Sequence, residues 1–244
     1  MSEAIVVKNL SKLYGEKKAV DNLSFTVEKG KIFGLLGANG AGKSTTIECM
    51  LGTKAMNNGT VSILDMDPKA NRKELFERVG VQFQEANYQD NIRVEELCKV
   101  TASLYRQPMD YQTLLIKFGI SDKHKTMVKD LSGGQRQRLF IILALIPNPE
   151  VVFLDELTTG LDTRARRGVW QIIGELKKLG ITIMLTSHFM DEVELLCDTI
   201  CILKKGEVVF MGTVKEAIEQ SPYDKLEDAY LWYSDEEVFE YEGV

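Results

Sequence analysis

The residues of this chain with the clearest chemical potential form a glycine-rich segment that ends in a lysine and a serine. Residues 37–44 (GANGAGKS) match the pattern GxxxxGK[ST] and lie between an apolar run and a helix-length pattern. Glycines at such positions let backbone N–H groups converge on phosphate oxygens, and the N-terminus of the following helix favours an anion. Lys43 would reach the β- and γ-phosphates of a nucleotide, and the Ser44 hydroxyl would ligate Mg²⁺. The segment therefore predicts a phosphate-binding loop rather than an ordinary glycine-rich turn.

A second candidate is an apolar run, residues 151–154, that ends in the carboxylates Asp155 and Glu156. In enzymes with a phosphate loop such a strand lies beside the loop, so Asp155 would hold hydrated Mg²⁺ and Glu156 would polarise the attacking water. Alone, the run is equally compatible with a strand that enters an acidic turn. Its occurrence in one chain with Lys43 favours the catalytic interpretation.

Residues 131–135 (LSGGQ), the signature segment, distinguish among the enzymes that use a phosphate loop, which include kinases, GTPases, helicases and transport ATPases. The segment precedes an apolar helical stretch, residues 139–145, and so predicts a second anion-binding helix N-terminus. With it, residues 4–215 resemble the ATP-binding cassette (ABC) family in the family's order of motifs. In that family two subunits sandwich two ATP molecules, and the signature segment of one subunit closes over the γ-phosphate held by the other. The resemblance implies ATP and Mg²⁺ as cofactors and a homodimer or a pair with another ABC ATPase.

Further positions match the family one by one. Tyr14 corresponds to the aromatic residue that stacks on adenine, and Gln84 to the glutamine that joins the Mg²⁺ and water network. Gln82 is the alternative for that glutamine because it is two residues away on the same strand face. Asp162 lies in a segment that resembles the family's loop that couples the two sites across the dimer, and His188 matches the switch histidine that contacts the γ-phosphate.

Two positions depart from the family pattern: Leu157 replaces the usual proline after the catalytic glutamate, and Ala38 stands where proline is common in the phosphate loop. The resemblance implies three sets of residues. The catalytic set is Glu156, His188 and Gln84, and the Mg²⁺ set is Ser44, Gln84 and Asp155. The nucleotide-binding set is Tyr14, Gly37, Asn39, Gly40, Ala41, Gly42, Lys43, Ser44, Thr45, Ser132, Gly133, Gly134, Gln135 and Asp162.

The elements that must position these residues alternate between strand-length apolar runs and helix-length periodic stretches. Runs at 4–7, 31–36, 151–154 and 181–186 predict strands, and 44–51 and 164–179 predict helices. Continuous apolar strands between helices favour a sheet covered on both faces. The first thirty residues predict an antiparallel layer, and residues 89–129 carry helical patterns. We therefore expect an α/β fold: a phosphate-loop (RecA-like) core with a mixed sheet, an N-terminal antiparallel β layer and an inserted helical subdomain.

The expected organisation is a nucleotide-binding domain, residues 1–223, with a helical subdomain at about 89–145 and an acidic C-terminal extension, residues 224–244. The extension carries eight acidic residues and one lysine, so the remaining residues sum to about +1 of the total net charge of −6. No basic surface typical of nucleic-acid binding is predicted. Because the extension also contains aromatic residues, both a packed and a solvated conformation are compatible with its sequence.

Composition also restricts the location of the chain. The longest apolar run, residues 139–146, has eight residues, far fewer than the roughly 20 needed to cross a bilayer. The N-terminus lacks a secretory signal pattern, so a cytoplasmic protein is expected. Four cysteines fit neither a disulfide framework nor a CxxC zinc pattern and are expected to be buried thiols. The cysteines are Cys49, Cys98, Cys197 and Cys201.

Within the family, the chain looks most like the ATPase subunits of drug, antibiotic and polysaccharide exporters. Residues 14–15, 19–21, 32–37, 187–194 and 226–230 carry that likeness. It implies a separate transmembrane permease and a peripheral position on the inner face of the cell membrane through that permease. The alternatives are a soluble ABC ATPase that acts on a non-transport target and a nucleotide-binding regulator without turnover. Glu156 and His188 argue against the regulator, and the transported substrate is not encoded in this chain.

Overall fold

The computed structural model describes residues 2–83, 88–89 and 91–234 and contains two sheets. The first is an antiparallel sheet of the N-terminal strands in the order β2-β1-β4. Its strands are β1 (Glu3–Tyr14), β2 (Lys17–Glu28) and β4 (Asn58–Ile63). Outward-facing polar residues alternate with buried apolar ones along β2, as expected for a sheet with one solvated face. The antiparallel N-terminal layer predicted from the sequence is therefore confirmed.

The second sheet has the order β5-β6-β7-β3-β8-β9. All its neighbouring strands are parallel except β8 and β9, so the sheet is mixed, as predicted. Strands β3, β6 and β7 are buried along their whole length because both faces of the sheet are covered. The bounds are β3 (Ile32–Leu36), β5 (Val79–Gln82), β6 (Val151–Asp155), β7 (Thr182–Thr186), β8 (Thr199–Lys204) and β9 (Glu207–Gly212).

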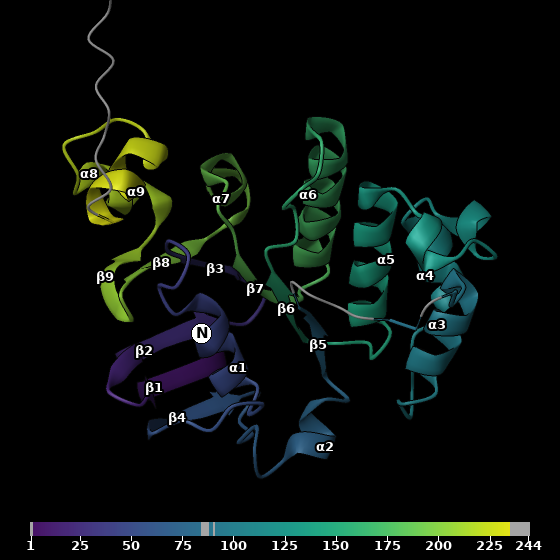
Figure 1. Cartoon of the computed structure of the whole chain (residues 1–244), viewed down its shortest axis with the longest axis horizontal. Helices are drawn as coiled ribbons and strands as arrows, with labels where there is room; N and C mark the ends of the chain where they lie inside the picture. Colours follow the sequence, from purple (N-terminus) through teal and green to yellow (C-terminus); the bar gives the residue numbers. More distant parts are fainter. Residues whose placement is uncertain (1, 84–87, 90, 235–244) are drawn as a thin grey trace, which may run out of the picture.

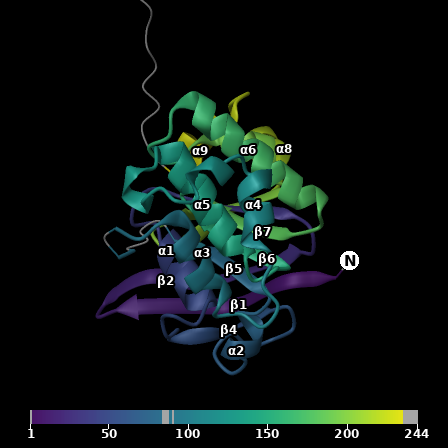
Figure 2. The same ribbon diagram turned by 90° about the vertical axis from the view of Figure 1, so that its right-hand side faces the viewer.

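Helices cover the second sheet on two sides, and alternate side chains of its strands point to each side. Phe33, Phe153 and Met184 join the core cluster that contains helix α1 and the N-terminal strands. Ile32, Val152 and Ile183 instead join the cluster that contains helices α5 and α6. Figure 1 accordingly shows α1 between the two sheets, and Figure 2 shows α5 and α6 on the face of the second sheet that points away from the N-terminal sheet. The nine α-helices assigned in the described residues are α1 (Lys43–Met50), α2 (Arg72–Leu75), α3 (Val94–Ala102), α4 (Tyr111–Lys117), α5 (Gly133–Leu145), α6 (Thr163–Lys178), α7 (Met190–Leu196), α8 (Val214–Glu219) and α9 (Leu226–Ser234).

The described residues between β5 and β6 include the helices α3, α4 and α5, which pack on one another, and short 3₁₀ turns at Ser121–Lys123 and Val128–Asp130. A close approach fixes α5 on the sheet, because a Cβ added at Gly80 in β5 would lie 1.9 Å from the Ala144 carbonyl oxygen. No helix within the described residues is long and apolar enough to span a membrane.

The start of the acidic extension packs on the domain. Leu226 of α9 is buried in a third apolar cluster with Ile200 of β8 and Phe210 of β9, and Ala229 of the same helix is also buried. Residues 235–244, the rest of the extension, lie outside the described residues. Three of the four cysteines are buried as expected, whereas Cys197 is half-buried.

Candidate active site

The glycine-rich segment forms the turn between β3 and α1, and two of its glycines are required by close contacts. Gly37 has φ 149°, and a Cβ there would lie 2.5 Å from the Leu203 carbonyl oxygen. Gly42 has φ 109°, and its Cβ would lie 2.4 Å from the Ala19 carbonyl oxygen of β2. Side chains are excluded at both positions by backbone atoms that cannot give way. The loop is thereby held against both β8 and the N-terminal layer.

The loop closes around the ammonium group of Lys43, the first residue of α1. Its Nζ donates to the carbonyl oxygens of Gly37 at 2.7 Å and Ala38 at 3.3 Å and lies 3.8 Å from Glu156 Oε1. Burial lowers the pKa of Lys43, and the carboxylates of Glu156 and Asp155 oppose that effect. Of the other loop residues, Asn39, Gly40 and Ser44 are exposed, Thr45 is half-buried and Ala41 is buried.

Asp155 ends β6 with its carboxyl group almost fully buried. Its Oδ1 accepts a 2.6 Å hydrogen bond from the Thr186 hydroxyl of β7. Burial raises the pKa of Asp155, while the hydrogen bonds from Thr186 and Ser44 and the charge of Lys43 lower it. A carboxylate and a hydroxyl next to each other are the oxygen ligands that Mg²⁺ prefers, and a divalent cation would offset the cost of burying the charge. Ser44 and Asp155 therefore fit the Mg²⁺ ion that the family implies.

Glu156 turns out of β6 with φ 49°, a left-handed conformation that non-glycine residues seldom adopt. Its N–H donates to the Thr186 hydroxyl at 2.9 Å, which holds the turn against β7. The Glu156 carboxylate lies 2.5 Å from Nε2 of His188, which follows β7. Lys43, Asp155, Glu156 and His188 thus meet at the carboxyl ends of three neighbouring strands, β3, β6 and β7. This edge of a parallel sheet is where α/β proteins bind ligands.

Tyr14 lies at the end of β1 with 46% of its surface exposed, and the Nζ atoms of Lys12 and Lys54 lie 5.0 Å and 5.8 Å from its ring centroid. An exposed ring of this kind could stack on a base. Gln84 lies outside the described residues. The alternative, Gln82, is buried; its Nε2 donates to the Phe83 carbonyl, and its Oε1 has no hydrogen-bond partner among the described residues.

The signature segment begins α5. Ser132 is the N-cap: its hydroxyl accepts from Gln135 N, and its own N–H donates to Gln135 Oε1 at 3.0 Å, so this glutamine oxygen already has a donor within the helix cap. A Cβ at Gly134 would lie 2.9 Å from the Ala165 side chain, so the segment packs closely on α6. Asp162 caps α6 by accepting from Ala165 N at 2.8 Å.

The signature segment and the phosphate loop belong to different sides of the second sheet. The α1 helix packs in the cluster between the two sheets, whereas α5 packs in the cluster on the opposite face. Ser132 and Gly133 are exposed at the start of α5. The predicted nucleotide-binding residues therefore form two groups in this chain, one around Lys43 and one at the exposed N-terminus of α5.

Sequence reasoning did not assign a role to two hydroxyl residues at the end of β7. Thr186 links Asp155 to the backbone of Glu156, and Ser187 donates to the buried carboxyl group of Glu192 in α7. The one available signal was their position, directly before His188. Leu157, where the family usually has proline, is buried in the cluster that contains α5 and α6.

Comparisons with known proteins agree with this geometry. The sequence model of the ABC transporter family matches residues 20–159. A Nod factor export ATP-binding protein I from Burkholderia lata is 36% identical over 217 residues, which cover 87% of this chain and 71% of that protein. Among solved structures, an ATP-binding subunit of an ABC transporter has a TM-score of 0.85 at 26% identity and covers 94% of this chain and 99% of its own. The bacterial ABC transporter cassette MJ0796, solved as a dimer, has a TM-score of 0.75 at 25% identity, with 86% and 98% covered. The chain belongs to the ABC transporter family, as an ATP-binding subunit with the ABC ATPase fold.

Proposed function

We propose that this chain hydrolyses ATP to power a membrane exporter. The observation that carries the proposal is the meeting of Lys43, Glu156 and His188 at the end of the phosphate loop, in a chain that also presents an exposed signature segment. Export as the direction of transport is supported by the Burkholderia lata relative, which is named for Nod factor export. That relative's cargo is not assigned to this chain.

The proposed roles follow from position and charge. Lys43 and the N–H groups at the start of α1 bind the β- and γ-phosphates, and Tyr14 stacks on adenine. Ser44 and Asp155 hold Mg²⁺, which neutralises phosphate charge when bound. Glu156 accepts the proton of the attacking water, and His188 holds that carboxylate on one side while it contacts the γ-phosphate. Gln84 joins the same set through the family resemblance.

A second cassette completes the site in this proposal. Because α1 and α5 lie on opposite faces of the second sheet, the exposed Ser132 and Gly133 of one chain would meet the nucleotide bound to another. The solved dimer of a related cassette supports such an arrangement. The partner is a second copy of this chain or another ABC ATPase.

The proposed membrane partner is a separate permease, through which the chain is peripheral on the inner face of the cell membrane. Apolar side chains next to Gln84 and in the helical region remain exposed: Phe83 directly precedes Gln84, and Val100 and Leu104 lie at the end of α3 and just after it. Exposed apolar side chains mark contacts with other proteins where they form a continuous patch, and we assign these three to such a patch. We expect a cytoplasmic helix of the permease to dock between Gln84 and the helical subdomain.

Purification of the tagged chain from detergent-solubilised membranes tests the proposal. A polytopic membrane protein should copurify, and the complex should hydrolyse ATP. Lys43→Ala should abolish hydrolysis without preventing copurification, since Lys43 is buried in the loop away from the exposed helical region. Recovery of an active ATPase with ribosomal or other soluble proteins, and with no membrane protein, would instead favour the soluble ABC ATPase that acts on a non-transport target.

A further inference from the structure

A carboxyl group outside the proposed catalytic set is buried in the first turn of α7. Glu192 is 2% exposed, and charged side chains reach such burial only when they are paired or hydrogen-bonded. Burial raises the pKa of Glu192 above its ordinary value, and hydrogen bonds from Ser187, Trp170 and Thr158 partly oppose that effect. Its neighbours therefore explain how the carboxyl group is tolerated at this position.

Three donors from three different segments converge on this carboxyl group. Thr158 Oγ1 donates to Oε2 at 3.1 Å, the Ser187 hydroxyl donates to the same oxygen, and Trp170 Nε1 donates to Oε1 at 2.9 Å. Thr158 belongs to the turn after β6, Ser187 follows β7, and Trp170 lies in α6. A carboxylate accepts from all three at once because it offers acceptor sites on both oxygens.

The two hydroxyl donors lie beside the proposed catalytic residues. Thr158 is two residues after Glu156, and Ser187 directly precedes His188. The Ser187 oxygen also accepts from Phe189 N at 3.0 Å, so the turn that carries His188 is fixed on both sides of the histidine. Glu192 consequently holds the turn that carries Glu156 and the turn that carries His188 against each other.

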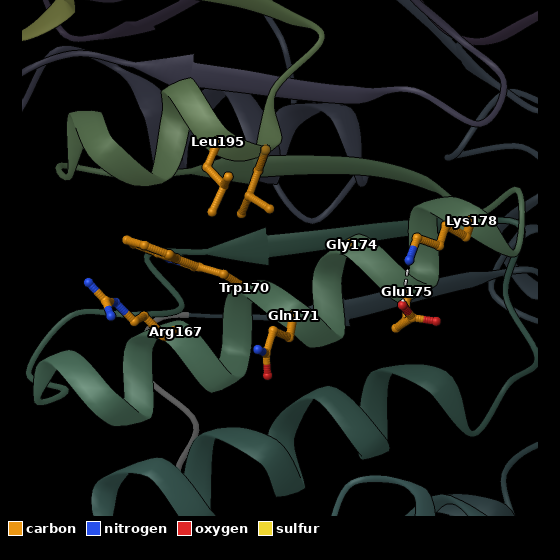
Figure 3. A pocket seen from close by; sticks show the side chains of 8 residues that line it. Arg167, Trp170, Gln171, Gly174, Glu175, Lys178 and Leu195 are labelled. Atoms are coloured by element: carbon orange, nitrogen blue, oxygen red, sulfur yellow. Dashed lines mark hydrogen bonds and ion pairs between the residues drawn. The ribbon is translucent and has the colours of Figure 1, made fainter.

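The third donor connects these turns to α6. Figure 3 shows the Trp170 side chain projecting from α6 toward α7, where it lines a surface groove of about 460 Å³ together with Leu195 and Leu196. The same helix packs through Ala165 on Gly134 of the signature segment. The carboxyl group therefore joins both catalytic turns to the helix that contacts the signature segment.

We propose that Glu192 is a positioning residue: through Thr158 and Ser187 it sets the distance between the Glu156 carboxylate and the His188 imidazole. The inference rests on the proposed function, in which those two side chains act on the γ-phosphate and the attacking water. Glu192 touches neither the nucleotide nor the water. Its loss should therefore affect the rate of hydrolysis much more than the binding of ATP.

The test compares Glu192→Ala with Glu192→Gln in the full-length chain, alone or with the permease that copurifies. A misplacement of about 1 Å in a reacting group can cost about a hundredfold in rate, so Glu192→Ala should lower kcat at least about tenfold. The Kd for ATP should stay within about threefold. Glu192→Gln should give a kcat between those of the wild type and Glu192→Ala. Its single amide oxygen can still accept from Trp170, whereas its amide N–H groups replace the oxygen that accepted from the hydroxyl groups of Thr158 and Ser187. Glu194→Gln, on the exposed side of the same helix, is the matched control and should keep kcat within about twofold.

A double-mutant cycle separates positioning from general destabilisation. Thr158→Val removes one of the two hydroxyl contacts, and the Thr158→Val/Glu192→Ala pair should hydrolyse ATP no more slowly than Glu192→Ala alone. Should Glu192→Ala not fold, Glu192→Gln completes the same cycle. Additive losses, a wild-type kcat in Glu192→Ala, or a Kd that worsens as much as kcat falls would each overturn the proposal. Absence of hydrolysis in the wild-type chain and its permease complex would instead refute the proposed function.

Discussion

Replacing Thr186 by valine removes a single buried hydroxyl group and keeps the shape of the side chain. That hydroxyl donates to Asp155 Oδ1 at 2.6 Å and accepts from Glu156 N at 2.9 Å, and Thr186 is almost fully buried. Loss of a charge-assisted hydrogen bond costs about 1.5–3 kcal/mol, and an unpaired buried N–H costs about 1–3 kcal/mol. We therefore expect Thr186→Val to lower the free energy of unfolding by about 2.5–6 kcal/mol.

Thr182→Val is the matched control because Thr182 lies buried on the same strand. Its hydroxyl accepts one neutral hydrogen bond, from Gly30 N at 2.9 Å, and makes no bond to a carboxylate among the described residues, so this variant should lose only about 1–3 kcal/mol. Urea unfolding measures both values. In an ATPase assay Thr186→Val should lower kcat at least about tenfold, because the turn of Glu156 loses its support, and Thr182→Val should leave kcat nearly unchanged. Equal losses in the two variants, or a loss below about 1 kcal/mol for Thr186→Val, would refute this reasoning.

Three further variants test other parts of the structure. Tyr14→Ala should weaken ATP binding by about 1–3 kcal/mol in calorimetry, with little effect on kcat at saturation; an unchanged Kd would exclude stacking at this ring. Leu157→Ala should lower the free energy of unfolding by about 2–5 kcal/mol because the side chain is buried, and a loss near zero would contradict that packing. Burial raises the pKa of Asp198, but the hydrogen bonds from the Ile32 N–H and from Lys177 together lower that pKa by more. The folded-state pKa of Asp198 therefore lies below the ordinary value. The stability that the Asp198 carboxylate contributes is present above its unfolded-state pKa of about 4 and is lost as pH falls through its folded-state pKa. Asp198→Asn should therefore lower the free energy of unfolding by about 1–3 kcal/mol at pH 7. The difference from wild type should shrink below about pH 4.

The sequence predicted those strands whose burial is complete. The runs at 31–36, 151–154 and 181–186 correspond to β3, β6 and β7, where an unbroken apolar stretch is the direct consequence of helices on both faces. Strand β9 gave a weaker pattern because it lies at the edge of the sheet and most of its side chains are exposed. Its hairpin with β8 turns at Lys205 and Gly206, both with positive φ, and this turn signal was present in the sequence.

The sequence predicted the candidate site at the positions that belong to a recognisable motif. The order of motifs placed Lys43, Asp155, Glu156 and His188 at strand ends, and the structure brings these four together. Their roles remain predictions, as does the role of Gln84. The network around Glu192 could not be predicted, because its partners come from segments up to 34 residues away in sequence and only the fold brings them into contact.

The boundary of the acidic extension also depended on the fold. Residues 224–244 have the charge of a solvated segment, yet α9 packs Leu226 against β8 and β9 and also buries Ala229. Apolar residues at these two positions pack in spite of the acidic residues between them. The division at residue 223 remains a prediction about domain organisation.

The central claim is that two cassettes share each ATP, and the Glu156→Gln variant tests it most directly. This change keeps the size of the side chain and removes the carboxylate that would activate water, so ATP should bind without being consumed and hold two chains together. Sedimentation should show a shift to dimer with ATP and Mg²⁺ but not with ADP, and a further Ser132→Arg change should abolish the shift while ATP still binds. A Glu156→Gln protein that binds ATP and remains monomeric, both alone and with its reconstituted membrane partner, would contradict the account.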